Sequence, residues 1–190
     1  CIRDRYNTNS ARRRGVFMKV LIIIPAYNEA KSIVNTVNML KNAKSTDYTL
    51  DYIVVNDGSK DNTRDVCLEN NINFIDLPIN LGIGGAVQTG YKYALYNDYD
   101  IAIQFDGDGQ HDANYISELV SEIEKGNDIV IGSRFIKNLS EFKSTAVRRV
   151  GINFLSSLIK ICTKKKVYDP TSGFRAANRT IIREFAKDYP

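Results

Sequence analysis

Residues 19–24 consist of Lys19 followed by an unbroken run of five apolar residues, Val-Leu-Ile-Ile-Ile. A strand with one buried face would alternate apolar and polar side chains, so this run predicts a strand that is buried on both faces. Such strands lie in the centre of parallel sheets that helices cover on both sides. Pro25 cannot donate a hydrogen bond to a neighbouring strand, so we expect the strand to end there and residues 25–29 to form a loop.

Strand and helix patterns alternate from residue 19 to residue 132. Apolar runs predict further strands at residues 51–55, 72–77, 100–105 and 128–132. Helical spacing after each of the first four strands predicts helices at about residues 33–40, 59–68, 80–96 and 113–125, the second of them beginning near Ser59. Ala86, Gly90 and Ala94 form a stripe of small residues that would let the third helix lie close to the sheet. The alternation predicts an α/β domain with a mostly parallel central sheet flanked by helices.

Length and composition fit one soluble domain of ordinary size. The chain has 190 residues, of which 43% are hydrophobic and 25% are charged. Residues 1–17 are polar and without periodicity, so we expect a disordered or extraneous extension ahead of a natural start at Met18, with the domain covering residues 18–190. The net charge of +4 comes with no basic and aromatic repeat, so nucleic acid is not an expected partner.

The cysteines and the histidine limit which metal sites and which thiol chemistry the chain can have. Cys1, Cys67 and Cys162 are far apart and have no metal-binding or CxxC spacing, so reduced thiols in a cytoplasmic setting are expected. His111 is the single histidine, which rules out a histidine-based metal site within this sequence. No apolar run reaches the ~20 residues that span a bilayer, and no signal peptide is visible.

Two carboxylates, Asp106 and Asp108, follow the predicted strand at residues 100–105, with only Gly107 between them. Neighbouring carboxylates repel each other, and burying either one is unfavourable unless a cation compensates its charge. Hard oxygen ligands suit Mg²⁺ or Mn²⁺, which keep open positions for phosphate oxygens. The alternative is an acidic surface turn, because Asp and Gly are frequent turn residues.

Polar groups also follow other predicted strands, at residues 25–29 and at Asp57. Ligands of open α/β sheets bind at the carboxyl ends of the strands, so these positions predict a ligand crevice. The chain has no GxxxxGK[ST] phosphate loop and no GxSxG nucleophile motif. Gly82-Ile83-Gly84-Gly85 has Val87 where a dinucleotide motif needs its third glycine, so nicotinamide binding is rejected. The ligand that these exclusions leave for the crevice is a nucleotide diphosphate bridged by a metal ion.

Several short motifs together resemble family 2 glycosyltransferases of the GT-A fold. They are residues 25–29 (PAYNE), 55–63 (VNDGSKDNT), 80–82 (NLG), 106–108 (DGD) and 132–134 (GSR), in the order and spacing of that family. Residues 169–175 (DPTSGFR) resemble the branch that includes polyprenyl-phosphate mannosyl- and glucosyltransferases. The resemblance runs from about residue 19 to the end. It implies a single GT-A, or nucleotide-diphospho-sugar transferase, domain that is incomplete at its C-terminus, with the general base beyond Pro190.

The resemblance also implies roles for individual residues. Asp108 would be the principal ligand of Mg²⁺ or Mn²⁺ and Gln110 a further ligand, although Gln110 is equally explained as a solvated turn residue. Asp106, Asp108 and Arg134 would form the catalytic set. Arg148, Arg149 and Arg175 are candidates for binding acceptor or donor phosphates, with surface ion pairs as the alternative. The nucleotide sugar would be held by Pro25, Ala26, Tyr27, Glu29, Asp57, Gly82, Asp106 and Gly107.

The expected function is a metal-dependent inverting glycosyltransferase that uses a UDP-, GDP- or dTDP-linked sugar. Residues 143–162 form an amphipathic pattern that would either pack on the sheet or face a membrane. Together with the branch resemblance, this pattern predicts a polyprenyl phosphate or lipid-linked glycan as acceptor, at the cytoplasmic, inner face of a membrane, in cell-envelope polysaccharide synthesis. A nucleotidyltransferase and a non-catalytic sugar-nucleotide-binding module are the alternatives, and no oligomeric state is predicted.

Overall fold

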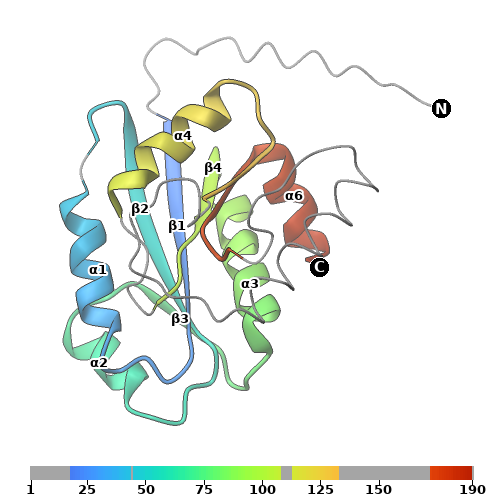
Figure 1. The fold of residues 1–190 in the computed structure, drawn as a ribbon. Helices are drawn as coiled ribbons and strands as arrows, with labels where there is room; N and C mark the ends of the chain where they lie inside the picture. Colours follow the sequence, from blue (N-terminus) through green and yellow to red (C-terminus); the bar gives the residue numbers. More distant parts are fainter. Residues whose placement is uncertain (1–17, 44, 108–112, 133–171, 190) are drawn as a thin grey trace, which may run out of the picture.

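Strand β1 (Met18–Ala26) lies at the centre of the sheet, where the apolar run predicted a doubly buried strand. The computed structural model describes residues 18–43, 45–107, 113–132 and 172–189 (Figure 1). Within them β1 pairs in parallel with β2 (Tyr48–Asn56) on one side and with β4 (Ile101–Gln104) on the other. Residues Val20 to Ile24 have no solvent exposure at all.

The described strands form one sheet in the order β3-β2-β1-β4-β6-β5. Strand β3 (Phe74–Asp76) extends the parallel part beyond β2. Strand β6 (Arg175–Asn178) runs antiparallel to β4 and to β5 (Ile129–Ile131) and separates them. The prediction of a mostly parallel α/β sheet is confirmed, but β6 was not predicted.

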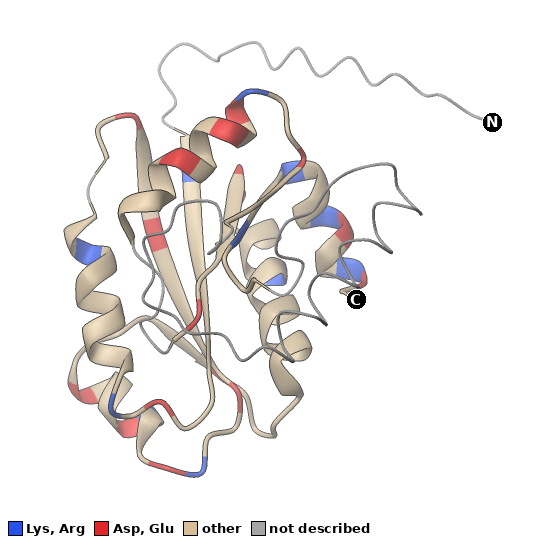
Figure 2. Cartoon of the chain, viewed as in Figure 1, with Lys and Arg blue, Asp and Glu red and all other residues tan. Residues whose placement is uncertain are grey.

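Helices cover both faces of this sheet (Figure 1). One core cluster joins even-numbered β1 side chains to α1 (Ile33–Asn42), α2 (Thr63–Glu69) and α4 (Ile116–Glu124), which follows a short 3-10 turn at Ala113–Tyr115. The other joins Leu21 and Ile23 to α3 (Gly82–Tyr96) and α6 (Arg179–Lys187). Charged residues occur along the helices, in the turns and at a few strand positions (Figure 2).

The stripe of small residues on α3 behaves as predicted. Ala86, Gly90 and Ala94 are buried, and a Cβ at Gly90 would stand 2.9 Å from Cγ1 of Ile23 in β1 and closer still to its Cγ2. Real Cβ atoms do not come this near to other atoms, so α3 can lie at its present distance from the sheet only with glycine at position 90.

Pro25 does not end β1, contrary to the prediction from sequence. The backbone of β1 points alternately to its two neighbours: Ile23 O accepts from Phe105 N–H on the β4 side, and Ala26 O accepts from Asp57 N–H on the β2 side. The nitrogen of Pro25 therefore faces the β4 side, beyond the last residue of β4. No ladder donor is needed there, so the strand continues through Pro25 with β2 alone as its partner.

Other boundaries also differ from the sequence prediction. The second helix begins at Thr63 rather than near Ser59, and the third strand is only three residues long. Within the described residues, no helix combines the length and apolar character that a membrane span requires.

Candidate nucleotide-sugar site

Strands β1, β2 and β4 run in parallel and deliver polar residues to one edge of the sheet. Ala26 lies beside Asn56 in the register of β1 and β2, and Ile23 lies beside Gln104 in that of β1 and β4. Asp57 and Asp106 therefore follow neighbouring positions at the carboxyl end of the sheet. This edge is where ligands of open α/β sheets bind.

A cavity of about 460 Å³ opens at this edge. Each of the eight residues that the sequence assigned to the nucleotide sugar lines it, so the structure brings all of them together. Asn80, Ile83 and Ala86 line it too and were not among the predicted site residues. Asn80 belongs to the quoted NLG motif, whereas Ile83 and Ala86 reach the cavity because α3 begins beside it. The lining is Pro25, Ala26, Tyr27, Glu29, Asp57, Asn80, Gly82, Ile83, Ala86, Asp106 and Gly107.

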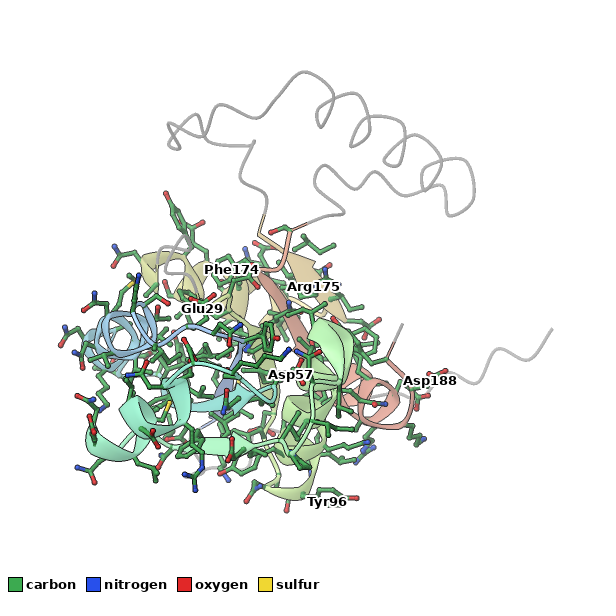
Figure 3. All side chains as sticks on the ribbon, turned by 90° about the horizontal axis from the view of Figure 1, so that it is seen from below. Glu29, Asp57, Tyr96, Phe174, Arg175 and Asp188 are labelled. Carbon is green, nitrogen blue, oxygen red and sulfur yellow. The ribbon has the colours of Figure 1, made fainter. Side chains whose placement is uncertain are left out.

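Asp57 is a buried carboxylate in the cavity wall, only 3% exposed (Figure 3). The N–H of Leu81 donates to its Oδ1 at 2.7 Å, and its own N–H donates to Ala26 O at 2.9 Å. Its Oδ2 has no hydrogen bond to a described residue. This oxygen is not among the fully buried polar atoms that lack a partner, so it can accept a hydrogen bond from a bound ligand.

The loop that carries Tyr27 and Glu29 is fixed from behind by hydrogen bonds to the turn after β2. Asn28 adopts a left-handed backbone with φ of 58°. Its Oδ1 accepts from the N–H groups of Lys60 (2.8 Å) and Asp61 (3.3 Å). Glu29 N–H donates to Thr63 Oγ1 at 2.9 Å, and Ser32 Oγ donates to the Glu29 carboxylate. Two loops from different strands thus form one wall.

Asp61 anchors the same wall from the β2 side. Its carboxylate accepts from the Thr63 hydroxyl and N–H and from the Ala30 N–H. Desolvation by itself would raise the pKa of Asp61, but these hydrogen bonds outweigh it and hold that pKa below its ordinary value.

Asp106 stands at the end of β4, against the beginning of β6. A Cβ at Gly173 would stand 2.5 Å from Oδ1 of Asp106 and nearer still to Oδ2, so only glycine leaves room for this carboxylate. Phe105 and Phe174 pack edge to face beside it, with ring centroids 5.7 Å apart. The next residue, Gly107, is fixed because its carbonyl oxygen accepts from the buried Thr36 hydroxyl of α1 at 3.0 Å.

Arg175, the predicted phosphate ligand, lies beside Gln104 at the same edge (Figure 3). Its Nη2 donates to Ser172 O at 2.9 Å, while its buried Nε has no partner among the described residues. The hydroxyl of Tyr91, also buried, has none either, and Tyr189 OH donates to Gln104 Oε1 at 3.2 Å. Buried polar groups with unused hydrogen-bonding capacity therefore occur at Arg175 and Tyr91, although neither residue lines the cavity.

Part of the predicted site falls outside the described residues. Within those ranges no three His, Cys, Asp or Glu side chains gather as a metal-binding group. Asp106 is the only acidic residue of the DGD motif that the structure places. The residues and segments outside are Asp108, Gln110, His111, Arg134, Arg148, Arg149, residues 143–162 and residues 169–171.

The sequence matches a family model described as Glycosyl transferase family 2 over residues 21–186. The chain is 37% identical over 183 residues to a UDP-N-acetylglucosamine–dolichyl-phosphate N-acetylglucosaminyltransferase of Methanococcus voltae, covering 86% of this chain and 71% of that protein. An undecaprenyl-phosphate mannosyltransferase of Micrococcus luteus is 29% identical over 177 residues, covering 90% and 71%.

Solved structures give the same fold. Glucosyl-3-phosphoglycerate synthase of Mycobacterium tuberculosis, in complex with Mn²⁺, UDP-glucose and phosphoglyceric acid, superposes with a TM-score of 0.65 at 19% identity. The match covers 86% of this chain and 57% of that one, so this chain spans less than two thirds of the synthase. At this identity the likeness concerns the fold alone, and the GT-A fold predicted from the sequence is confirmed.

Proposed function

The chain belongs to glycosyl transferase family 2, and we propose that it moves a sugar from a nucleotide diphosphate sugar to an acceptor, inverting the anomeric carbon. The observation that carries this proposal is the cavity at the carboxyl end of the sheet. Its wall joins the buried Asp57 carboxylate to Asp106 and to the first residues of α3.

Two neighbouring features of the cavity suit such a donor. Asp57 has a carboxylate oriented by Leu81 N–H and an unused oxygen, so it would accept hydrogen bonds from the base or ribose, beside Tyr27 and Glu29. Beside Asp57, which accepts from Leu81 N–H, Gly82 and Ile83 begin a fifteen-residue helix. The free N–H groups and the dipole of a helix N-terminus favour phosphate oxygens.

We further propose that Mg²⁺ or Mn²⁺ is required, with Asp108 as its principal ligand and Gln110 as a further ligand. The described part of the site fits, because Asp106 and Gly107 lie in the cavity wall immediately before these residues. A bound divalent ion would neutralise the diphosphate as the bond between sugar and phosphate breaks. The complex of the mycobacterial synthase with Mn²⁺ and UDP-glucose supports this choice of ion and of donor.

For the acceptor we propose a polyprenyl phosphate or a lipid-linked glycan at the inner face of a membrane. Support comes from relatives whose names specify dolichyl phosphate and undecaprenyl phosphate as acceptors. Arg175 lies at the carboxyl edge of the sheet with its Nε free of any described partner, where a guanidinium could hold phosphate. Arg134, Arg148 and Arg149 are proposed to assist it on the basis of sequence. A phosphate acceptor is already ionised, so it would need no general base, whereas an alcohol acceptor would.

Titration calorimetry against UDP, GDP and dTDP, each with and without MnCl₂, tests the donor site. We expect one of the three diphosphates to bind in a Mn²⁺-dependent manner, which also identifies the base. Asp108→Asn should abolish the gain from Mn²⁺ while leaving the nucleoside monophosphate bound as in wild type. Asp57→Ala should weaken monophosphate and diphosphate alike, by about tenfold or more, because a charged hydrogen-bond acceptor is removed.

The outcomes separate the competing functions. Turnover of a nucleoside triphosphate would indicate a nucleotidyltransferase instead. Donor binding without transfer to isoprenoid phosphate, lipid-linked glycan or water would indicate a binding module. If Asp57→Ala and Asp108→Asn both bind every nucleotide as wild type does, the cavity is not the donor site.

A further inference from the structure

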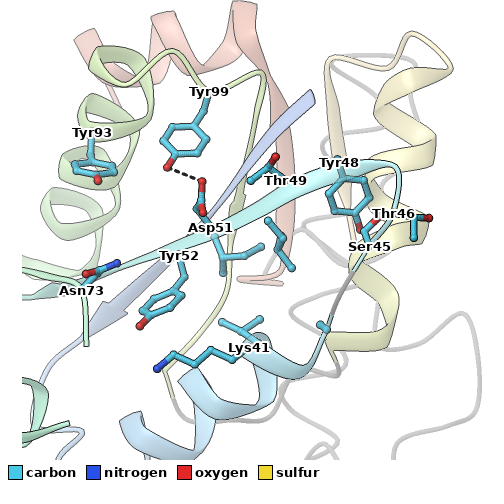
Figure 4. Close-up of a pocket in the computed structure, with 14 residues that line it drawn as sticks. Lys41, Ser45, Thr46, Tyr48, Thr49, Asp51, Tyr52, Asn73, Tyr93 and Tyr99 are labelled. Carbon is cyan, nitrogen blue, oxygen red and sulfur yellow. Dashed lines mark hydrogen bonds between the residues drawn. The ribbon is translucent and has the colours of Figure 1, made fainter. Parts of the chain in front are cut away.

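A second and larger cavity, about 730 Å³, lies along the outer edge of β2 near its amino-terminal end (Figure 4). It is at the opposite end of β2 from Asp57 and shares no lining residue with the nucleotide-sugar site. Four tyrosines line it, Tyr48, Tyr52, Tyr93 and Tyr99. Nothing in the proposed reaction uses this groove.

The groove exists because β3 covers only the last part of β2. Strand β3 pairs with Val54–Asn56, which leaves residues 48–53 without an outer neighbour among the described strands. Val54 N–H donates to Asn73 O and Asn56 O accepts from Leu77 N–H, so even-numbered residues of β2 point their backbone groups outward. The outward groups of Tyr48, Leu50 and Tyr52 have no hydrogen bond to any described residue.

Side chains flank this open edge on both sides, as Figure 4 shows. On the α3 side, the rings of Tyr93 and Tyr99 stack with centroids 6.4 Å apart, and Tyr99 OH donates to Asp51 Oδ2 at 3.1 Å. On the α1 side, Lys41 Nζ lies 5.9 Å from the ring centre of Tyr52. Backbone groups between two side-chain walls form the geometry in which an added strand docks. Residues 48–52 contain neither Pro nor Lys, which commonly protect open edges.

We propose that a second copy of this chain occupies the groove, with the two β2 edges paired antiparallel about a two-fold axis at Leu50. Leu50 then faces Leu50 of the other copy, and Tyr48 faces Tyr52. These are the residues whose backbone groups point outward, so each facing pair can exchange both of its hydrogen bonds. A two-fold interface of this kind uses the same patch on both copies.

Charge at the two ends of the groove favours a second copy over an unrelated peptide. Lys41, in the last turn of α1, and Asn73 lie at one end, and the exposed Asp47 precedes β2 at the other. Figure 4 shows Lys41 at the α1 side of the groove. Neither Lys41 nor Asp47 has an ion pair with a described residue. The two-fold axis brings Asp47 of each copy to the Lys41 end of the other, so the contact occurs twice.

Sedimentation equilibrium of the 190-residue chain over a range of concentrations tests the proposal. We expect a monomer–dimer equilibrium in wild type. Lys41→Asp should place two acids together at both ends, and Asp47→Lys should place two bases together. Each variant alone should dimerise about tenfold more weakly or worse, because like charges across an interface repel. An equimolar mixture should recover the wild-type affinity to within about threefold, since both contacts in the mixed dimer join opposite charges.

Lys125→Asp, a charge reversal at the end of α4, serves as the matched control and should dimerise like wild type. Circular dichroism melts verify that each variant is folded. A monomeric wild type at all concentrations overturns the proposal, and so does a mixture that dimerises no better than its components. The mixed-dimer recovery is specific to a contact between copies, because an effect within one chain cannot be repaired by adding another.

Discussion

Gly173 and Asp106 show how one absent side chain shapes the candidate site. The carboxylate of Asp106 occupies the space that a Cβ at residue 173 would need. Gly173 comes from the segment before β6, whereas Asp106 follows β4, so the contact depends on the antiparallel pairing of these two strands. The position of the carboxylate in the cavity wall is therefore set jointly by two distant parts of the sequence.

Gly173→Ala should therefore displace Asp106 and weaken binding of the nucleotide diphosphate by about tenfold, at a modest loss of stability of about 1–3 kcal/mol from overpacking. Calorimetry with the diphosphate and MnCl₂, together with a urea melt, measures both effects. Gly84→Ala is the control, because its Cβ would meet only Tyr189 Cδ1 at an ordinary 3.9 Å. Equal binding by wild type and Gly173→Ala would show that the position of Asp106 does not matter to the donor.

At the scale of elements, the loop after β1 and the turn after β2 hold each other in place. Neither has internal secondary structure that would fix it. Asn28 accepts from the backbone of one side, and Asp61 accepts from Ala30 on the other, so the hydrogen bonds run in both directions. Because side chains bond to backbone groups here, the wall of the cavity is fixed without a strand or helix.

The lowered pKa of Asp61 makes part of this arrangement pH-dependent. A carboxyl whose pKa is lower in the folded state stabilises the fold fully above its ordinary value, which is 3.8 here. That contribution is lost as pH falls through the lowered value. Asp61→Asn, which cannot titrate, should be less stable than wild type at about pH 6, and the difference should shrink at about pH 3.

Urea unfolding of both proteins at the two pH values provides the measurement. Glu69→Gln is a suitable control, because Glu69 is an exposed carboxylate at the end of α2 without a hydrogen bond or ion pair to a described residue. A stability difference for Asp61→Asn that is the same at both pH values would show that the hydrogen bonds do not depend on the charge of Asp61.

The elements that could be predicted are those whose own residue pattern shows that they are buried. The apolar run of β1 and the small stripe of α3 both express burial directly. The residues of β6, Arg-Ala-Ala-Asn, show no alternation, and the strand exists because β4 and β5 flank it. Pro25 continues β1 because β4 has already ended, which depends on the register of two strands. The shared carboxyl edge of parallel strands predicted a crevice at residues 25–29, Asp57 and Asp106, and the resemblance to family 2 glycosyltransferases supplied the full set of eight. Ile83 and Ala86 depend on how α3 packs.

For the molecule as a whole, helix α3 belongs both to the core and to the cavity wall, so its distance from the sheet affects both. Val87, Tyr91 and Ala94 of α3 pack with Leu21 and Ile23 in the core cluster on that face. The first turns of the same helix supply Gly82, Ile83 and Ala86 to the cavity. Gly90, between these two parts, sets how closely the helix approaches β1.

Gly90→Ala should therefore destabilise the protein, although alanine is favoured over glycine in a helix by about 0.5–1 kcal/mol. The added methyl would overlap Ile23, and overpacking of this kind costs about 1–3 kcal/mol. Ile23→Ala alone should lose about 2–5 kcal/mol because it leaves a cavity under α3. In the double variant the new methyl fills part of that cavity, so the double loss should be smaller than the sum of the single losses by about 1 kcal/mol or more. Urea unfolding of the four proteins completes the cycle, and strict additivity would mean that Gly90 does not set the spacing between α3 and the sheet.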